Sequence, residues 1–175
     1  MTETSTTAEA PVILDEVEPA IFRIRLNRPS QRNAMNKRAR VDFIHALDEC
    51  RGRAKVIIIA GTGAAFCAGV DLKERAAERR ANNGGMAPQE HDLDSRRSHW
   101  AAVQEEIRRH PSIVIASVNG FALGGGITLI NSADLAIAAD EARIGIPEIG
   151  FGAYAGWPRL PPSCGSVPST RPGSC

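Results

Sequence analysis

Two segments of the chain repeat one design, in which a short apolar run passes through glycines into a pattern typical of a helix. The first is IIIAGTGAAFCAGVDLKE, residues 57–74, and the second is IASVNGFALGGGITLI, residues 115–130. A short apolar run bounded by glycine is typical of a buried strand. Buried strands that alternate with helices predict an α/β domain.

The patterns before and between these segments fit the same fold class. Apolar residues alternate in AIFRIRLNRP, residues 20–29, which predicts a strand with one buried face. VILDEV before it predicts the partner strand of a hairpin. Residues 37–51 have apolar side chains at helical spacing between Asn36, which can cap the helix, and Gly52, which can end it.

The second half of the chain contains an irregular stretch and then further elements. Residues 75–98 are charged and include the breaker cluster ANNGGMAPQ, so we expect a mobile surface segment there. A helix that ends at HPS is predicted by the spacing of Leu93, Trp100, Val103 and Ile107. IVIASV, DLAIAAD and ARIGIPE predict three further strands.

Composition sets the limits of the domain and disfavours several classes of partner. Residues 1–11 are small and polar, and residues 157–175 are crowded with proline, serine and glycine, so we expect both to be disordered around a core domain over residues 12–156. The formal net charge of +1 disfavours a nucleic-acid partner. Four scattered cysteines disfavour a zinc site or disulfide framework. With no targeting pattern at the start, we expect a cytoplasmic protein.

The nearly uncharged stretch over residues 112–130 is long enough to be considered as a membrane span. Asn119 and the glycines in its centre favour a different interpretation, in which a buried strand, a turn and a buried helix follow one another. We therefore expect no membrane partner.

Gly124, Gly125 and Gly126 stand together at the start of the last predicted helix. Because each glycine weakens a helix interior by about 1 kcal/mol relative to alanine, the run needs a reason. One reason is tight packing of the helix; another is an anionic ligand that approaches the free N–H groups at its start. A phosphate loop is disfavoured, since Phe66 stands where the pattern G-x-G-x-x-G needs its third glycine.

Four longer motifs, taken together, are far more specific than any one of them. They are LNRPSQRNAMN at residues 26–36, AFCAGVDLKE at 65–74, NGFALGGGITL at 119–129 and IGIPEIGFG at 144–152. In order and spacing they resemble the signature segments of the enoyl-CoA hydratase/isomerase family, the crotonases. The resemblance implies an α/β, crotonase-like (ClpP/crotonase) fold of repeated ββα units.

The resemblance also implies an enzyme that binds an acyl-CoA thioester and holds its carbonyl oxygen between two backbone N–H groups while an enolate forms. By motif position the donors would be Val70 and Gly125. Loss of one such donor costs about 2.7–4 kcal/mol of transition-state stabilisation, which exceeds the cost of a helical glycine.

Glu148 in IPEIG matches the general acid/base of the family. Apolar neighbours Ile146, Ile149 and Phe151 are expected to surround its carboxyl and to raise its pKa toward the working range. Thr128 departs from the hydratase pattern, which has a second glutamate at that position. A single acid/base suits double-bond isomerisation better than hydration.

For the CoA portion, the resemblance implies adenine contacts with the backbone near Ala34 and Ala68, and phosphate contacts with Arg32 and Lys73. Asp71 is expected to be structural as well, and Cys67 to be a small buried residue rather than a nucleophile. Coenzyme A enters as part of the substrate, so we expect no separate cofactor and no metal. The full set expected at the CoA ester is Arg32, Ala34, Ala68, Val70, Asp71, Leu72, Lys73 and Gly125.

Crotonases continue beyond the last motif into a C-terminal helical region that covers the acyl pocket and builds a homotrimer or hexamer. Here the resemblance ends near Gly156, so we expect a truncated or frame-shifted chain that lacks that region. Two alternatives stay open at this point. One is an inactive remnant that at most binds CoA esters, and the other is a phosphate-binding α/β module.

Overall fold

The computed structural model describes residues 10–81, 99–147 and 149. A hairpin of β1 (Val12–Glu18) and β2 (Ile21–Leu26) comes first, followed by a short 3-10 turn (Pro29–Gln31) and the helix α1 (Lys37–Cys50). The middle of the chain forms β3 (Val56–Gly61), β4 (Ala65–Cys67) and α2 (Leu72–Ala81). The remaining elements are α4 (Trp100–Arg108), β5 (Ile113–Val118), β6 (Phe121–Leu123), α5 (Gly125–Ser132), β7 (Leu135–Ala138) and β8 (Ile144–Gly145).

Two sheets organise the described residues. The larger has the order β1-β2-β3-β5-β7, in which β1 pairs with β2 antiparallel and the later neighbours are parallel. The smaller has the order β4-β6-β8, with parallel pairs. Each glycine-rich segment therefore contributes one strand to each sheet and then a helix, as β3-β4-α2 and β5-β6-α5. This confirms the predicted α/β fold of repeated ββα units.

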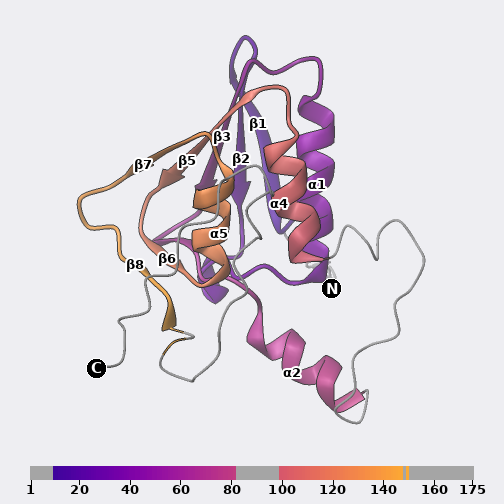
Figure 1. The fold of residues 1–175 in the computed structure, drawn as a ribbon, viewed down its shortest axis with the longest axis vertical. Coiled ribbons are helices and arrows are strands. Elements are labelled where there is room, and N and C mark those ends of the chain that lie inside the picture. The colour runs from indigo at the N-terminus through magenta and orange to yellow at the C-terminus, as the bar shows by residue number, and fades with distance from the viewer. Residues whose placement is uncertain (1–9, 82–98, 148, 150–175) are drawn as a thin grey trace, which may run out of the picture.

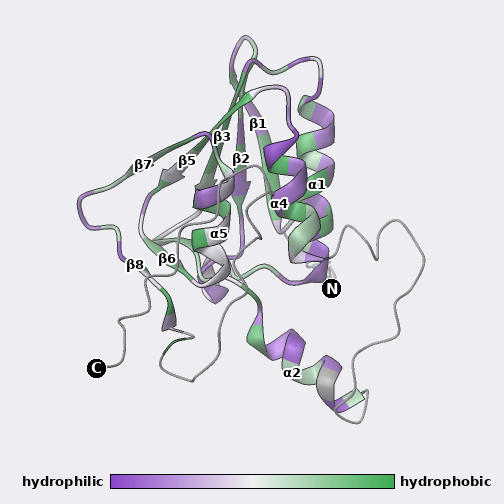
Figure 2. Ribbon diagram, in the orientation of Figure 1, coloured by the Kyte–Doolittle hydropathy of each residue, from purple (hydrophilic) through white to green (hydrophobic). Residues whose placement is uncertain are grey.

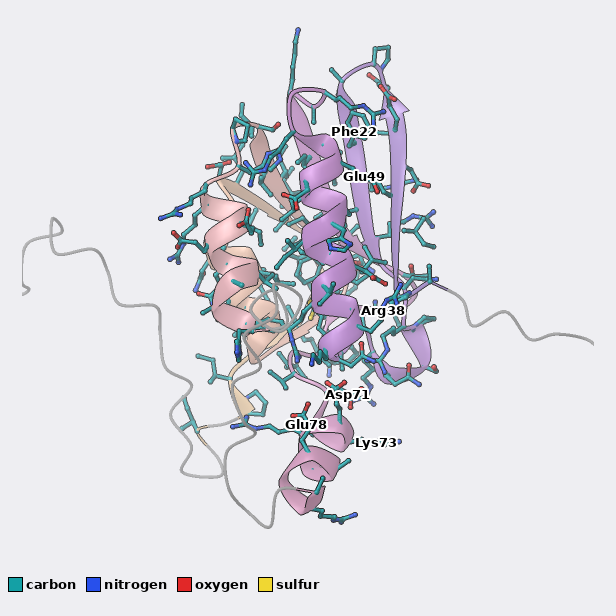
Figure 3. The ribbon with its side chains drawn as sticks, turned by 90° about the vertical axis from the view of Figure 1, so that its right-hand side faces the viewer. Phe22, Arg38, Glu49, Asp71, Lys73 and Glu78 are labelled. Carbon is teal, nitrogen blue, oxygen red and sulfur yellow. The ribbon has the colours of Figure 1, made fainter. Side chains whose placement is uncertain are left out.

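The core lies between the larger sheet and the helices packed against it (Figure 1). Helix α1 contacts β1, β2 and α4, and α4 contacts α5; a view from the side shows α1 and α4 next to each other in front of the sheet (Figure 3). Alternation in β2 buries Phe22, Ile24 and Leu26 as predicted, while α1 supplies Phe43 and Ile44 from its inner face.

The predicted ends of α1 are confirmed by its hydrogen bonds. The Asn36 side-chain oxygen accepts from the Ala39 amide at 2.9 Å, which satisfies one of the free N–H groups of the first turn. The helix ends at Cys50, directly before Arg51 and Gly52. Capping thus fixes the position where the preceding loop, residues 28–36, leaves the core.

The prediction of an irregular segment is wrong for residues 75–81, which belong to α2. Its sequence LKERAAERRA consists of strong helix formers but has no apolar stripe, so hydrophobic periodicity could not reveal it. Figure 2 shows α2 as mostly hydrophilic and extending away from the apolar strands. The rest of the predicted segment, residues 82–98, lies outside the described residues, as does Leu93.

The predicted disordered ends lie mostly outside the described residues. Of residues 1–11 the structure describes Ala10 and Pro11, whose carbonyl oxygens accept hydrogen bonds from the Asn27 side chain and amide at 3.1 and 2.8 Å. Within the described ranges, every helix is too short or too polar to cross a bilayer. Residues 112–130 form strand, turn, strand and helix, as the alternative to a membrane span predicted.

Candidate active site

The two glycine-rich segments meet where β4 and β6 end. These strands pair in parallel, with Ala65 opposite Phe121 and Cys67 opposite Ala122, so both lead out at the same edge of the small sheet. A Cβ built on Gly69 would lie 2.7 Å from the Gly125 nitrogen and 2.8 Å from the Leu123 oxygen. No side chain fits in that space, so the two backbones touch.

All three consecutive glycines have a steric reason in this structure. Gly124 caps α5 with φ +51° and ψ −112°, a conformation closed to other residues. A Cβ on Gly125 would lie 2.6 Å from the Trp100 ring, and one on Gly126 would overlap the carbonyl oxygen of Cys67. Tight packing therefore explains the run by itself, and the same packing brings the start of α5 against Gly69.

The amides of Val70 and Gly125 flank this contact. Gly125 is the first residue of α5, so its N–H precedes the first bond within the helix. Val70 forms an isolated parallel bridge with Met35, in which Met35 donates to the Gly69 oxygen at 2.8 Å and accepts from Asp71 at 3.3 Å. Neither Val70 nor Gly125 donates its amide to a backbone acceptor within the part of the chain that the structure describes.

The bridge pattern also orients the Val70 amide. Because the oxygen of Gly69 and the amide of Asp71 both face Met35, the intervening Val70 N–H faces away from the loop at residues 28–36. Two adjacent chain segments thus each offer an N–H donor that has no backbone acceptor among residues 10–81, 99–147 and 149. Such a pair of donors can stabilise negative charge that develops on an oxygen placed between them.

Ion pairs fix the segment that carries Val70. Asp71 lies at the start of α2, below α1 (Figure 3), with a carboxylate 2.9 Å from the Arg28 guanidinium. Its other oxygen accepts from the amides of Lys73 and Glu74 at 3.1 and 3.3 Å. Burial raises the pKa of Asp71, but the bonds from Arg28 and the two amides outweigh it and hold the pKa below its usual value. This confirms the structural role expected of Asp71.

Glu74 is committed to the fold as well. Its carboxylate accepts from the Lys37 amide at 2.8 and 3.1 Å, at the start of α1, and lies 3.8 Å from Arg40. Both acidic groups near Val70 therefore hold neighbouring segments together. As placed, neither Asp71 nor Glu74 is a carboxylate free to work as a second general base.

Most of the residues expected to contact CoA lie in two loops that run side by side. The Ala68 amide donates to the Arg32 oxygen at 3.0 Å, and Ala34 precedes the bridge residue Met35. Arg32 is exposed, with its guanidinium 5.8 Å from the centroid of the Phe121 ring.

Leu72 and Lys73 are exposed on the first turn of α2, and Lys73 points away from the body of the molecule (Figure 3). A surface cavity of about 360 Å³ borders the loop over residues 27–31 and the start of α1. Its lining includes neither Val70 nor Gly125. The structure therefore brings the expected CoA residues near the amides of Val70 and Gly125, while this cavity lies beside the loop over residues 27–31.

Glu148 lies outside the described residues, and so does Phe151. Its neighbours are described: Gly145 accepts a hydrogen bond from the Gly124 amide at 3.1 Å, which joins β8 to the start of the glycine run. Ile149 is 74% exposed, so the expectation of a buried apolar side chain at that position is wrong, while the surroundings of the Glu148 carboxyl lie outside the described residues.

Cys67 is buried, and burial raises the pKa of its thiol to about 12. A thiol with that pKa is protonated near neutral pH, which confirms that Cys67 is a packed residue and not a nucleophile. His110 is likewise held in the fold, between the Leu47 oxygen at 3.0 Å and the Ser112 amide at 3.2 Å. Among the described residues, no cluster of three His, Cys, Asp or Glu side chains could hold a metal.

Sequence reasoning missed the position of Trp100 in this site. Trp100 begins α4, and its indole N–H donates to the Thr128 hydroxyl on α5, which in turn donates to the Gly125 oxygen at 2.6 Å. The helical spacing of Trp100 indicated only a buried face. No local signal connects two residues that lie 28 positions apart.

Comparison with known proteins assigns this chain to a family. The protein-family model described as enoyl-CoA hydratase/isomerase matches residues 16–166. Hydroxycinnamoyl-CoA hydratase-lyase of Pseudomonas fluorescens is 36% identical over 144 residues, which are 81% of this chain and 50% of that protein. A probable enoyl-CoA hydratase of Bacillus subtilis is 32% identical over 140 residues, 77% of this chain and 51% of that protein.

The fold is shared with solved structures of the same kind. Enoyl-CoA hydratase from Bacillus anthracis superposes with a TM-score of 0.69 and 30% identity, covering 83% of this chain and 54% of that one. The chain spans about half the length of the relatives it matches. The family model, the relatives and the fold agree, and the chain belongs to the enoyl-CoA hydratase/isomerase family, the crotonases.

Proposed function

We propose that the protein processes an acyl-CoA thioester by proton transfer, with the thioester oxygen held between the amides of Val70 and Gly125 and with Glu148 as general acid/base. One observation carries the proposal: Gly69 and Gly125 touch through their backbones, next to two N–H groups that have no backbone acceptor in the described residues. Family membership supplies the substrate class, since the relatives described above are named as hydratases and a hydratase-lyase of CoA esters.

The chemistry follows from the charge that each step creates. Glu148 would take a proton from C2 of a 3-enoyl-CoA, the electrons would move onto the thioester oxygen, and the same carboxyl would return a proton at C4. Each of the two N–H donors would contribute about 2.7–4 kcal/mol to stabilising the enolate. A 2-enoyl-CoA is the product, and Glu148 ends the cycle ionised, as it began.

Isomerisation is favoured over hydration by the state of Thr128. Its hydroxyl proton is donated to the Gly125 oxygen, and the hydroxyl oxygen accepts from Trp100. A neutral hydroxyl that already donates its proton cannot activate water as a second carboxylate would. We therefore expect addition of water to be slow relative to movement of the double bond.

For the CoA portion we propose contacts along the two adjacent loops. Backbone atoms of Ala34 and Ala68 would meet the adenine, and the exposed cations Arg32 and Lys73 would lie near the phosphates. Asp71 and Leu72 would contribute backbone only, since the Asp71 carboxylate is held by Arg28. A homotrimer or hexamer and a cytoplasmic location stay predictions.

Paired assays test the reaction. The full chain would be given 3-enoyl-CoA and 2-enoyl-CoA of the same length, and both the 2-enoyl product and the hydrated product would be measured. We expect isomerisation to exceed hydration, and Glu148→Gln to lower the isomerisation rate about a hundredfold or more. Equal hydration and isomerisation would contradict the single-base proposal.

A binding experiment separates turnover from recognition. Calorimetric titration with acetyl-CoA and with inorganic phosphate should give binding of the thioester only. Glu148→Gln should bind acetyl-CoA with unchanged affinity, since the carboxyl acts on the proton. Binding without turnover would instead favour an inactive CoA-ester binder, and phosphate binding alone would favour a phosphate-binding module.

A further inference from the structure

Trp100 and Thr128 form a closed hydrogen-bonded pair over the start of α5. The Trp100 indole N–H donates to the Thr128 oxygen, and the Thr128 hydroxyl donates to the carbonyl oxygen of Gly125 at 2.6 Å. The pair links two helices, because Trp100 is the first residue of α4 and Thr128 lies one turn into α5. It ends on the residue that supplies one of the two proposed oxygen-binding amides.

The indole ring lies against the meeting point of the two glycine-rich segments. The Cζ2 and Cε2 atoms of Trp100 would lie 2.6 and 3.0 Å from a Cβ on Gly125, on the side where Gly69 Cα would lie at 3.1 Å. The ring therefore fills the space on the side-chain side of Gly125. Trp100 is only partly buried, so part of its surface remains available to a ligand.

Resting on the function proposed above, we propose that Trp100 forms the aromatic wall of the acyl site and positions the Gly125 amide through Thr128. A thioester oxygen bound at the Gly125 amide would bring the carbons next to the carbonyl into contact with this ring. Because the indole N–H is held by Thr128 and the ring packs against Gly125, a bulky acyl group would have to displace both contacts. The wall would therefore select a flat acyl group, such as an enoyl chain, over one branched at C2.

The same pair would keep water from this side of the reacting carbons. The ring presents apolar atoms, and the two polar atoms of the pair bond to each other or to Gly125. A half-buried hydroxyl that already donates its proton and accepts one hydrogen bond attracts little additional water. Trp100 is thus a specificity-determining residue by contact, and Thr128 is a positioning residue that acts through Gly125.

Fluorescence tests the contact directly. In a Trp157→Phe background the indole emission comes from Trp100 alone, since the chain has two tryptophans. We expect a short 2-enoyl-CoA to change that emission and free CoA to leave it unchanged. If calorimetry shows that the 2-enoyl-CoA binds while the emission stays constant, the wall is absent and the inference is overturned, although the proposed function stands.

Substitutions test the positioning role. Thr128→Val keeps the shape but removes both bonds, so we expect kcat to fall about tenfold with little change in KM, as for a group that acts in the transition state. Thr128→Ser should restore most of the activity. Trp100→Phe should lower kcat severalfold and raise the acceptance of acyl groups branched at C2.

Ser132→Ala provides the matched control, because the Ser132 hydroxyl donates to the backbone carbonyl oxygen of Thr128 at 2.7 Å and takes no part in the bonds of the Thr128 side chain. It should leave kcat unchanged. Equal losses in Thr128→Val and Ser132→Ala would reduce the pair to a structural contact and overturn the inference. If no CoA ester binds to the unmodified chain, the proposed function fails, and the inference fails with it.

Discussion

The two ββα units of this molecule share one backbone plan but hold their helices in different ways. Helix α5 is held by close packing. Its glycines leave no room for a Cβ, so its backbone approaches Cys67, Gly69 and the Trp100 ring closely. Helix α2 is held by charge, through Asp71 on Arg28 and Glu74 at the start of α1. One proposed donor amide is thus sensitive to packing and the other to electrostatics.

The largest expected effect adds a methyl group on the packed side. Gly126→Ala would force a Cβ into the Cys67 carbonyl, and because both partners are backbone, the helix must shift. We expect a loss of about 2–3 kcal/mol in the free energy of unfolding, measured in urea. Gly145→Ala is the control, since its Cβ would sit 3.5 Å from the Leu123 side chain and should be tolerated. Equal stability of the two variants would contradict the conclusion that close packing at Gly126 holds α5.

The next effect removes a charge on the other side. Asp71→Asn would break the bond with Arg28 and weaken the cap of α2, so we expect a loss of about 2 kcal/mol in the free energy of unfolding. Glu105→Gln, which breaks an exposed pair with Arg109, should cost less than about 0.5 kcal/mol. An Asp71→Asn variant as stable as Glu105→Gln would show that charge does not hold α2.

Acidification should remove the same contribution gradually. The pKa of Asp71 is lowered in the folded state, so its stabilisation is fully present above the ordinary value of 3.8 and is lost as the pH falls through the lower folded-state pKa. The unfolding free energies of the unmodified protein and Asp71→Asn should therefore converge on acidification. Gly126→Ala should keep a constant difference from the unmodified protein. Parallel curves for Asp71→Asn would contradict the assignment.

The smallest expected effect concerns CoA rather than stability. Arg32 is exposed beside Phe121, so Arg32→Gln should leave the unfolding free energy nearly unchanged and raise KM for a CoA ester about threefold. Arg109→Gln, which changes another exposed arginine just past the C-terminal end of α4, should not change KM. An effect of equal size in both variants would indicate only general attraction of the anionic substrate.

Local patterns were enough to predict the elements whose apolar residues recur with a strand or helix period. Alternation predicted β2, and the Asn36 cap with helical spacing predicted α1, because both patterns result from one buried face. Helix α2 was missed for the opposite reason, since LKERAAERRA buries no stripe and is held at its first turn. Only its propensity could have shown it.

The parts of the site that lie within single sequence motifs were predicted. The Val70 and Gly125 segments were expected to act together, and the structure brings their backbones into contact. The pairing of Arg28 with Asp71 and of Trp100 with Thr128 depends on residues far apart in sequence, which single motifs do not encode. The exposure of Ile149 was missed because an apolar residue beside Glu148 was taken as buried.

Met35 has a consequence for how heat should act on the proposed activity. Its side chain is 1% exposed in the core, while its backbone holds both Gly69 and Asp71. A single residue therefore transmits motion of the interior to the donor at position 70. Larger motions of the core on warming would displace the Val70 amide before the chain unfolds. The proposed activity should therefore decline at a lower temperature than that at which the secondary structure melts.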